Sequence, residues 1–89
     1  MTDINAILSD RDKSYGNFYD QATISLRLKD IMHGQKNWLG FSPDMKEAAD
    51  MIQVKFGRLL NGDPRHVDSW RDIAGYATLV ADRLENKRS

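Results

Sequence analysis

The sequence contains no cysteine and only two histidines, and these absences limit the sites it can build. Without cysteine, disulfides and thiolate-bound metals are both excluded. His33 and His66 alone are too few for a histidine-based metal site unless carboxylates complete it. This composition suits a reducing cytoplasm, and we expect no resident metal or cofactor.

Net charge and long apolar runs are also missing. Lysine plus arginine total 13 and aspartate plus glutamate total 13, so the formal charge is zero. Proteins that bind polymeric DNA or RNA normally carry basic excess, because phosphate neutralisation supplies most of their affinity. No apolar run approaches the roughly 18 residues that a membrane span needs, and MTDINAIL does not read as a signal peptide. We therefore expect neither polymeric nucleic acid nor a membrane as a partner. A local basic pocket for a small anionic ligand remains compatible with a neutral chain.

What the sequence does contain is helical periodicity. A chain of 89 residues holds one core, so we predict a single all-α domain over residues 1–89. Its architecture would be a small bundle of three to four helices that oligomerises through apolar helix faces. The predicted helices cover about residues 3–12, 18–32, 43–60 and 66–86.

Capping residues and turn signals set these boundaries. Thr2 is the expected N-cap of the first helix, Asn17 of the second and Ser42, which precedes a proline, of the third. For the last helix Asp63 and Asp68 compete as caps. Glycine and asparagine in the segments between them are typical of turns.

Apolar side chains are too many for one small core. The second helix is apolar on two sides, and the loop at 35–41 carries Trp38, Leu39 and Phe41, as a lid on the core or as a contact surface. We expect the following apolar residues of the last two helices to point inward: Met45, Ala48, Ala49, Ile52, Phe56, Leu59, Leu60, Trp70, Ile73, Ala74, Ala77, Val80, Ala81 and Leu84. The surplus predicts a homo-oligomer with closed symmetry.

Two segments near the second helix could bind an anion. Residues 13–19 combine a lysine, a glycine turn, aromatic rings and a helix N-terminus, a combination that suits phosphate and base stacking. The alternative is a capped turn whose rings pack on the core. Arg27 and Lys29 follow on the helix, but they are two residues apart, so at most one should reach a given ligand. More often such residues are solvated surface or partners of neighbouring carboxylates.

Two further sets lie in the second half of the chain. Arg65, His66 and Arg71 surround the start of the last helix, as an anion site or as surface charges beside a core tryptophan. Acidic pairs occur at Glu47/Asp50 and at Asp68/Asp72, and antiparallel packing of their helices would keep the pairs apart. A Mg²⁺ site would then need a partner chain.

Two motifs carry a family resemblance that covers about residues 10–85. They are the turn Tyr15-Gly16-Asn17-Phe18 and the helical segment Asp68-Ser69-Trp70-Arg71-Asp72-Ile73-Ala74-Gly75-Tyr76-Ala77. Together they resemble the YG-x-F turn and the D-x-W-x-D-x-A-G-Y-A helix of the anti-CBASS cyclic-nucleotide sponges of tailed phages.

This resemblance implies a non-catalytic function in the cytoplasm of an infected bacterial host. Such sponges are helical hexamers that capture cyclic dinucleotides such as cyclic GMP–AMP at subunit interfaces, and cyclic trinucleotides in separate pockets, so that the CBASS effector stays inactive. Carried over to this chain, the resemblance assigns base stacking to Tyr15 within a turn that includes Gly16 and Phe18. Phosphate contact falls to Lys29, or as second choice Arg27. The second kind of pocket would use Arg65 and Arg71.

Two other functions compete with this interpretation. One is an all-α, Mg²⁺-dependent nucleotide pyrophosphohydrolase of the MazG-like kind, for which only Glu47-x-x-Asp50 remains of the usual acidic pattern. The other is a protein–protein adaptor that uses the aromatic loop at 35–41.

Overall fold

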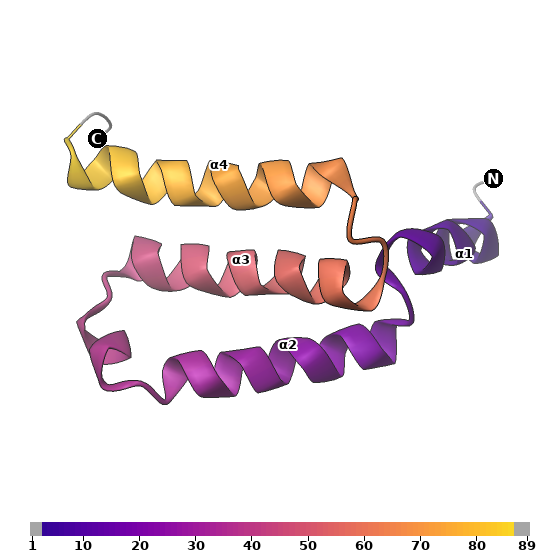
Figure 1. The fold of residues 1–89 in the computed structure, drawn as a ribbon, viewed down its shortest axis with the longest axis horizontal. Helices are drawn as coiled ribbons and strands as arrows, with labels where there is room; N and C mark the ends of the chain where they lie inside the picture. The colour runs from indigo at the N-terminus through magenta and orange to yellow at the C-terminus, as the bar shows by residue number, and fades with distance from the viewer. Residues whose placement is uncertain (1–2, 87–89) are drawn as a thin grey trace.

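The computed structural model describes residues 3–86, which form four α-helices and one short 3-10 helix with no strand in that span (Figure 1). The elements are α1 (Ile4–Tyr15), α2 (Phe18–His33), η1 (Lys36–Gly40), α3 (Pro43–Asn61) and α4 (Val67–Leu84). This confirms the all-α prediction. No helix within 3–86 is both long and apolar enough to cross a bilayer.

The first helix is longer at its C-terminal end than predicted. Its N-cap is Asp3, whose carboxylate accepts two backbone N–H groups of the first turn, while Thr2 lies outside the described residues. α1 then continues past the predicted end at Asp12 and ends at Tyr15. It ends there because Gly16 takes a φ of 77°, which a helix cannot continue.

The last helix begins with a histidine cap, so both predicted caps were wrong. His66 Nδ1 accepts the backbone N–H of Ser69 at 3.3 Å and lies 2.9 Å from the Ser69 hydroxyl. Asp63 instead accepts from the backbone N–H of Arg65 in the preceding turn. Asp68 lies inside the first turn of α4, where its charge still favours the helix dipole.

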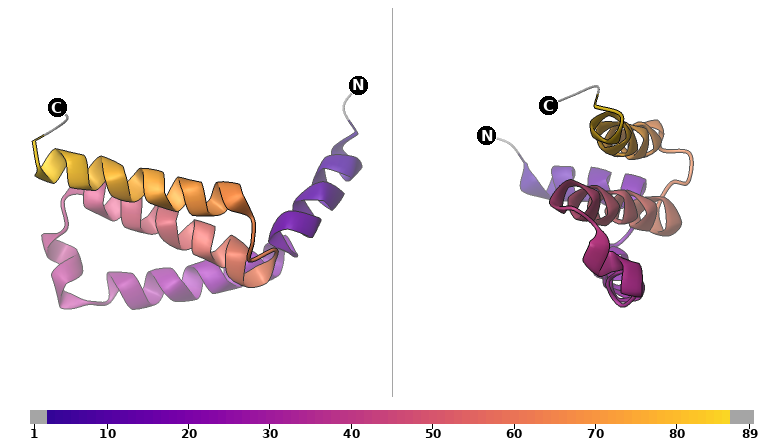
Figure 2. Two further views of the ribbon diagram at one scale, coloured as in Figure 1. Left: turned by 45° about the horizontal axis from the view of Figure 1, so that its top comes forward. Right: turned by 90° about the vertical axis from the view of Figure 1, so that its left-hand side faces the viewer.

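The helices are arranged as a layer with α3 in the middle. Figures 1 and 2 show α2 and α4 running alongside α3 on opposite sides, while α1 projects from one end. The radius of gyration of 15.2 Å exceeds the roughly 12 Å expected for a compact domain of this length. A layer one helix thick leaves two broad faces of α3 without a covering helix.

The sides of α3 can be assigned from its contacts. Gly57 faces α2, and Lys55 pairs with Asp72 of α4 at 3.0 Å. The α3 residues that lie between its α2 side and its α4 side line one uncovered face. The α3 residues half a helical turn away line the other uncovered face. We call the first of these the apolar face. Its lining residues are Leu28, Met32, Ala49, Ile52, Phe56, Leu60 and Trp70. The groove face is the opposite one and carries Val54 and Arg58.

Few apolar side chains are buried between the helices. Among the described residues only two hydrophobic side chains are fully buried, and four polar ones join them: Ala48 and Leu59, with Gln21, Ser25, Gln53 and Ser69. The predicted inward positions of Phe56, Leu60, Trp70 and Leu84 were wrong for the chain taken alone, because these side chains are 39%, 68%, 48% and 58% exposed. The predicted inward alanines of α4, Ala74, Ala77 and Ala81, are exposed as well. The layer gives them no helix to pack beneath.

The predicted loop at 35–41 contains the 3-10 helix η1 and covers only part of the molecule. Trp38 stacks on His33 with ring centroids 4.3 Å apart and lies 5.3 Å from the ring of Phe41. His33 also approaches the Asp50 carboxylate at 2.7 Å. Leu39 points into solvent and is 84% exposed. Two of the three loop hydrophobics therefore fold back, and the third does not.

A charge cluster connects the start of α3 with the end of α4. Ser42 occupies the predicted N-cap position, but its hydroxyl bonds the Asp44 carboxylate at 2.5 Å and accepts from Arg83 at 2.9 Å. Arg83 also pairs with Asp44 directly. The Arg83 guanidinium, helped by the Ser42 hydroxyl, lowers the pKa of Asp44 from 3.8 to about 2.

This cluster predicts an acid-sensitive contribution to stability. Because the pKa of Asp44 is lower in the folded state, the contribution is present above 3.8 and is lost as pH falls towards about 2. We expect Arg83→Met to raise the pKa of Asp44 towards its ordinary value, as measured by NMR titration of the side-chain carboxyl carbon. Arg71→Met, on the same helix, should leave that pKa unchanged. A pKa that stays near 2 in the Arg83 variant would contradict the assignment.

Candidate functional site

The turn between α1 and α2 is held against the end of α3. The Asn61 side-chain amide donates to the backbone carbonyls of Tyr15 and Asn17, at 3.0 and 2.9 Å. The backbone N–H of Asp63 donates to the carbonyl of Ser14 at 2.8 Å. We call this contact between the two turns the corner. It fixes how α1 and α2 leave the layer.

The Tyr15 ring lies inside this corner among cationic and aromatic groups. Arg58 of α3 lies over the ring, 4.4 Å from its centroid, and Arg11 of α1 lies 5.2 Å from it. His66 approaches edge-on at 5.3 Å. Tyr15 thereby contacts arginines from two different helices.

These arginines border a groove of about 350 Å³ on the groove face. Its walls come from α1, α2 and α3, and the lining residues are Arg11, Phe18, Gln21, Ala22, Ser25, Leu26, Lys29, Val54 and Arg58. Three of these are cations and none is a carboxylate. The volume is within the roughly 300–1,000 Å³ typical of small-molecule sites.

The donors of the groove are only partly used by the protein itself. Arg11 donates to the Gln21 side-chain carbonyl at 3.4 Å, a long contact. Nε of Arg58 is buried and has no hydrogen-bond partner among the described residues. An unpaired guanidinium donor costs free energy unless a ligand accepts from it. The groove therefore suits an anion with an apolar or aromatic portion.

The structure brings together two of the five predicted nucleotide-binding residues in this groove. Lys29 is half-buried and lines it, and Phe18 forms its aromatic edge with Arg11 5.4 Å from the ring. Tyr15 and Gly16 belong to the corner beside it and are not lining residues. Arg27 is exposed and lies outside it, which favours Lys29 of the two alternatives on α2.

Sequence reasoning missed Arg11, Arg58 and Gln21. The predicted end of the first helix at Asp12 hid the i, i+4 relation that places Arg11 and Tyr15 on the same side of α1. Arg58 could not be found this way, because its approach to Tyr15 depends on how α3 packs against the corner. A correct boundary for α1 would have recovered Arg11 alone.

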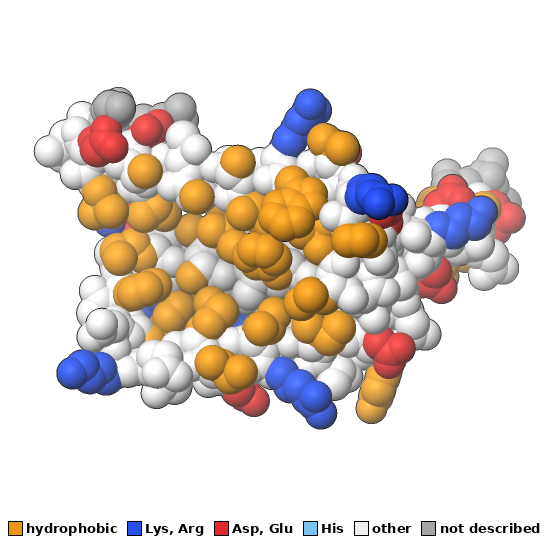
Figure 3. Space-filling view, in the orientation of Figure 1, with side chains coloured by type: hydrophobic (Ala, Val, Ile, Leu, Met, Phe, Trp, Pro, Cys, Tyr) orange, Lys and Arg blue, Asp and Glu red, His pale blue; other side chains and the backbone are white. Residues whose placement is uncertain are grey.

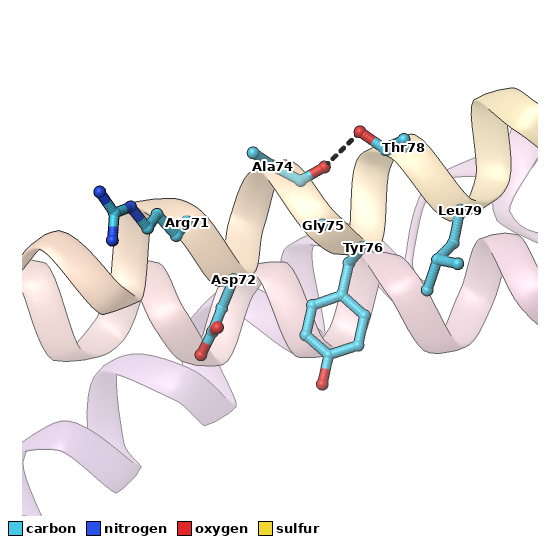
Figure 4. Close-up of a pocket in the computed structure, with 7 residues that line it drawn as sticks. All are labelled: Arg71, Asp72, Ala74, Gly75, Tyr76, Thr78 and Leu79. Atoms are coloured by element: carbon cyan, nitrogen blue, oxygen red, sulfur yellow. Dashed lines mark hydrogen bonds between the residues drawn. The ribbon is translucent and has the colours of Figure 1, made fainter.

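The predicted second pocket is only partly formed in the single chain. Arg71 lines a shallow hollow, but every lining residue belongs to α4, and Arg65 is not one of them (Figure 4). The Thr78 hydroxyl there already donates to the Ala74 carbonyl at 2.7 Å. Gly75 faces open space, so no helix of this chain uses the close approach that it permits. The hollow has no opposing wall to hold a ligand.

The acidic residues engage in separate contacts. Asp50 pairs with His33 and Asp72 with Lys55, on opposite sides of α3. Glu47 is exposed on the groove face near Tyr76 and Arg83. Within residues 3–86 no group of three or more His, Cys, Asp or Glu side chains is placed to hold a metal ion.

The corner predicts opposite effects for two glycine substitutions. A Cβ on Gly16 would lie 2.2 Å from the Asn61 carbonyl oxygen, and its φ of 77° disfavours other residues. We expect Gly16→Ala to lower the free energy of unfolding by roughly 1–3 kcal/mol from backbone strain alone. Gly75→Ala, whose Cβ meets nothing within 4 Å, should raise it by about 0.5–1 kcal/mol. Urea denaturation measures both, and equal stabilities would contradict the corner geometry.

Comparison with known proteins gives one match. No curated protein and no solved structure shows a significant match to the chain. The family DUF6378, described as a domain of unknown function, matches residues 2–84. Since this match covers nearly the whole chain, the protein belongs to the DUF6378 family.

Proposed function

We propose that the protein binds cyclic oligonucleotide second messengers in the groove between α1, α2 and α3 and sequesters them without cleavage. In an infected bacterial cytoplasm this would keep a CBASS effector inactive, as a phage anti-defence function. Cyclic dinucleotides such as cyclic GMP–AMP are the first candidates, and cyclic trinucleotides the second. The observation that carries the proposal is a groove lined by three cations and an exposed phenyl ring, with no carboxylate.

The chemistry of the groove matches this ligand class in charge. A cyclic dinucleotide carries two phosphodiester charges, and Arg11, Lys29 and Arg58 come from three different helices. Arginine can contact a phosphate through two parallel N–H groups, whereas lysine acts as a point charge. The side chain of Phe18 is 63% exposed and offers an apolar surface on which a base can stack.

The charge distribution also supports a small ligand rather than a polymer. The whole chain is formally neutral, so it lacks the broad basic surface on which extended nucleic acid depends. Three of its 13 lysines and arginines instead line one groove that no carboxylate lines. In the proposed function the chain works as a homo-oligomer, a hexamer by resemblance to the phage sponges, and the YG-x-F turn that carries this resemblance borders the groove.

Two substitutions on α2 test the site. We expect Lys29→Ala to raise the Kd for cyclic GMP–AMP at least tenfold, a loss of roughly 1.4 kcal/mol of binding free energy, because Lys29 lines the groove. Arg27→Ala removes an equal charge two residues away, outside the groove, and should change Kd less than twofold. Isothermal titration calorimetry at fixed salt measures both. Equal effects of the two variants on Kd would show that the groove is not the binding site.

The fate of the nucleotide distinguishes sequestration from catalysis. The protein is incubated with cyclic GMP–AMP and Mg²⁺ and then heat-denatured, and the released nucleotide is analysed by chromatography. Intact nucleotide that appears only after denaturation supports the proposal. Linear or monophosphate products would favour an enzyme that hydrolyses phosphodiester bonds. A parallel incubation with a nucleoside triphosphate, which has the phosphoanhydride bond that cyclic GMP–AMP lacks, tests a Mg²⁺-dependent pyrophosphohydrolase. Nucleotide that never leaves solution would favour a protein–protein adaptor.

A further inference from the structure

The apolar face has the composition of a buried surface but no covering element. Figure 3 shows hydrophobic side chains forming a continuous band across α2, α3 and α4, with the charged side chains at its edges. On this face Phe56 packs edge-on against Trp70, with ring centroids 5.9 Å apart. Towards η1 the band continues over Met32, Trp38 and Phe41.

The size of the uncovered surface can be judged against compact proteins. The accessible surface of the chain is 6597 Å². A folded monomer of 10.2 kDa is expected to expose roughly 5,300 Å², so the excess is roughly 1,300 Å². A standard protein–protein interface buries about 800 Å² on each partner, and obligate homodimers bury more. The excess of the whole chain, to which the projecting α1 also contributes, is therefore as large as one side of an obligate interface.

We infer that the apolar face is the surface on which a second copy of this chain packs, layer against layer. The band is self-complementary in chemistry, because it is apolar at its centre and charged only at its rim, as a two-fold interface requires. Two layers packed in this way form a six-helix body that covers Ile52, Phe56 and Leu60 on both copies. The apolar face is then the surface through which the proposed self-assembly occurs. It is inferred from apolar composition and exposed area, which do not depend on nucleotide binding.

The second copy leaves the candidate groove accessible. Arg58 and Val54 of the groove face lie half a helical turn from Phe56 and Ile52, so the groove opens away from the paired surface. Figure 2 shows α1 displaced to one side of the layer, and Arg11 of α1 lines the groove. α1 therefore does not stand between the two apolar faces.

Two leucine-to-lysine substitutions test this interface. Leu60 lies on the apolar face and is 68% exposed, and Leu79 lies on the other side of the layer and is 51% exposed. We expect Leu60→Lys to raise the dissociation constant between copies at least tenfold, because pairing would bury its charge. Leu79→Lys should assemble like the wild type. Sedimentation equilibrium of the full chain measures the mass, with circular dichroism as a check on helicity.

Several results would overturn the inference. They are a wild-type chain that is monomeric at micromolar concentration, a Leu60→Lys variant that assembles unchanged, and a Leu79→Lys variant that dissociates equally. In the first case the face would belong to another partner. The sedimentation measurement is made without nucleotide. If the protein does not bind cyclic dinucleotides, the result on self-association therefore still stands.

A second measurement applies even if Leu60→Lys does not fold. Because the chain lacks cysteine, Leu60→Cys and Leu79→Cys each introduce a single reactive thiol by a mild substitution. Pairing should slow the labelling of Leu60→Cys at least tenfold as protein concentration rises, while Leu79→Cys reacts at a constant rate. Equal concentration dependence at both positions would overturn the interface.

Discussion

The contact between the two turns determines where the remaining parts of the molecule can lie. Asn61 reaches across from the end of α3 and satisfies two backbone carbonyls of the turn that contains Gly16. That contact is so close that neither Gly16 nor Gly62 could carry a Cβ without meeting backbone atoms at 2.2–2.5 Å. One consequence is that α1 is directed away from the layer instead of over it. A second is that Tyr15 is brought under Arg58, which places two arginines at one end of the groove.

Since α1 does not cover the layer, α3 has helices on two sides and none on the other two. The two uncovered faces differ in chemistry: one is apolar across three helices, and the other contains the cationic groove. The seam between α2 and α3 is polar: the Ser25 hydroxyl donates to Gln53 at 3.1 Å, and the Gln53 amide nitrogen has no partner among residues 3–86. Such a seam contributes little hydrophobic stabilisation. In the inferred pairing of two copies, apolar burial between the chains would be the larger remaining source of stability.

Local signals in the sequence predicted most of the secondary structure. Helix spacing gave four helices in the right places, and Asn17 caps α2 as expected by accepting from the backbone of Asp20. One error occurred where the cap is chemically unusual, the imidazole of His66, and another where α1 continues past Asp12 to Tyr15. Exposure was harder to predict, because apolar spacing shows which side of a helix avoids water but not what covers it. Phe56 and Leu60 follow an inward pattern, yet the chain alone supplies nothing above them.

The candidate groove could be predicted only in part, for a related reason. Lys29 and Phe18 were predicted from residue type and from the family resemblance, but their meeting with Arg58 depends on the register between α2 and α3. The contact of Gln53 with Ser25 and the close packing of Gly57 against Gln21 fix that register. A shift of one residue along α3 would rotate Arg58 by about 100° and move its guanidinium out of the groove. A more apolar seam would tolerate such a shift more easily, since hydrophobic contacts are not directional. The polar seam therefore exchanges some stability for a defined position of the cation, and the proposed recognition of an anion depends on that position.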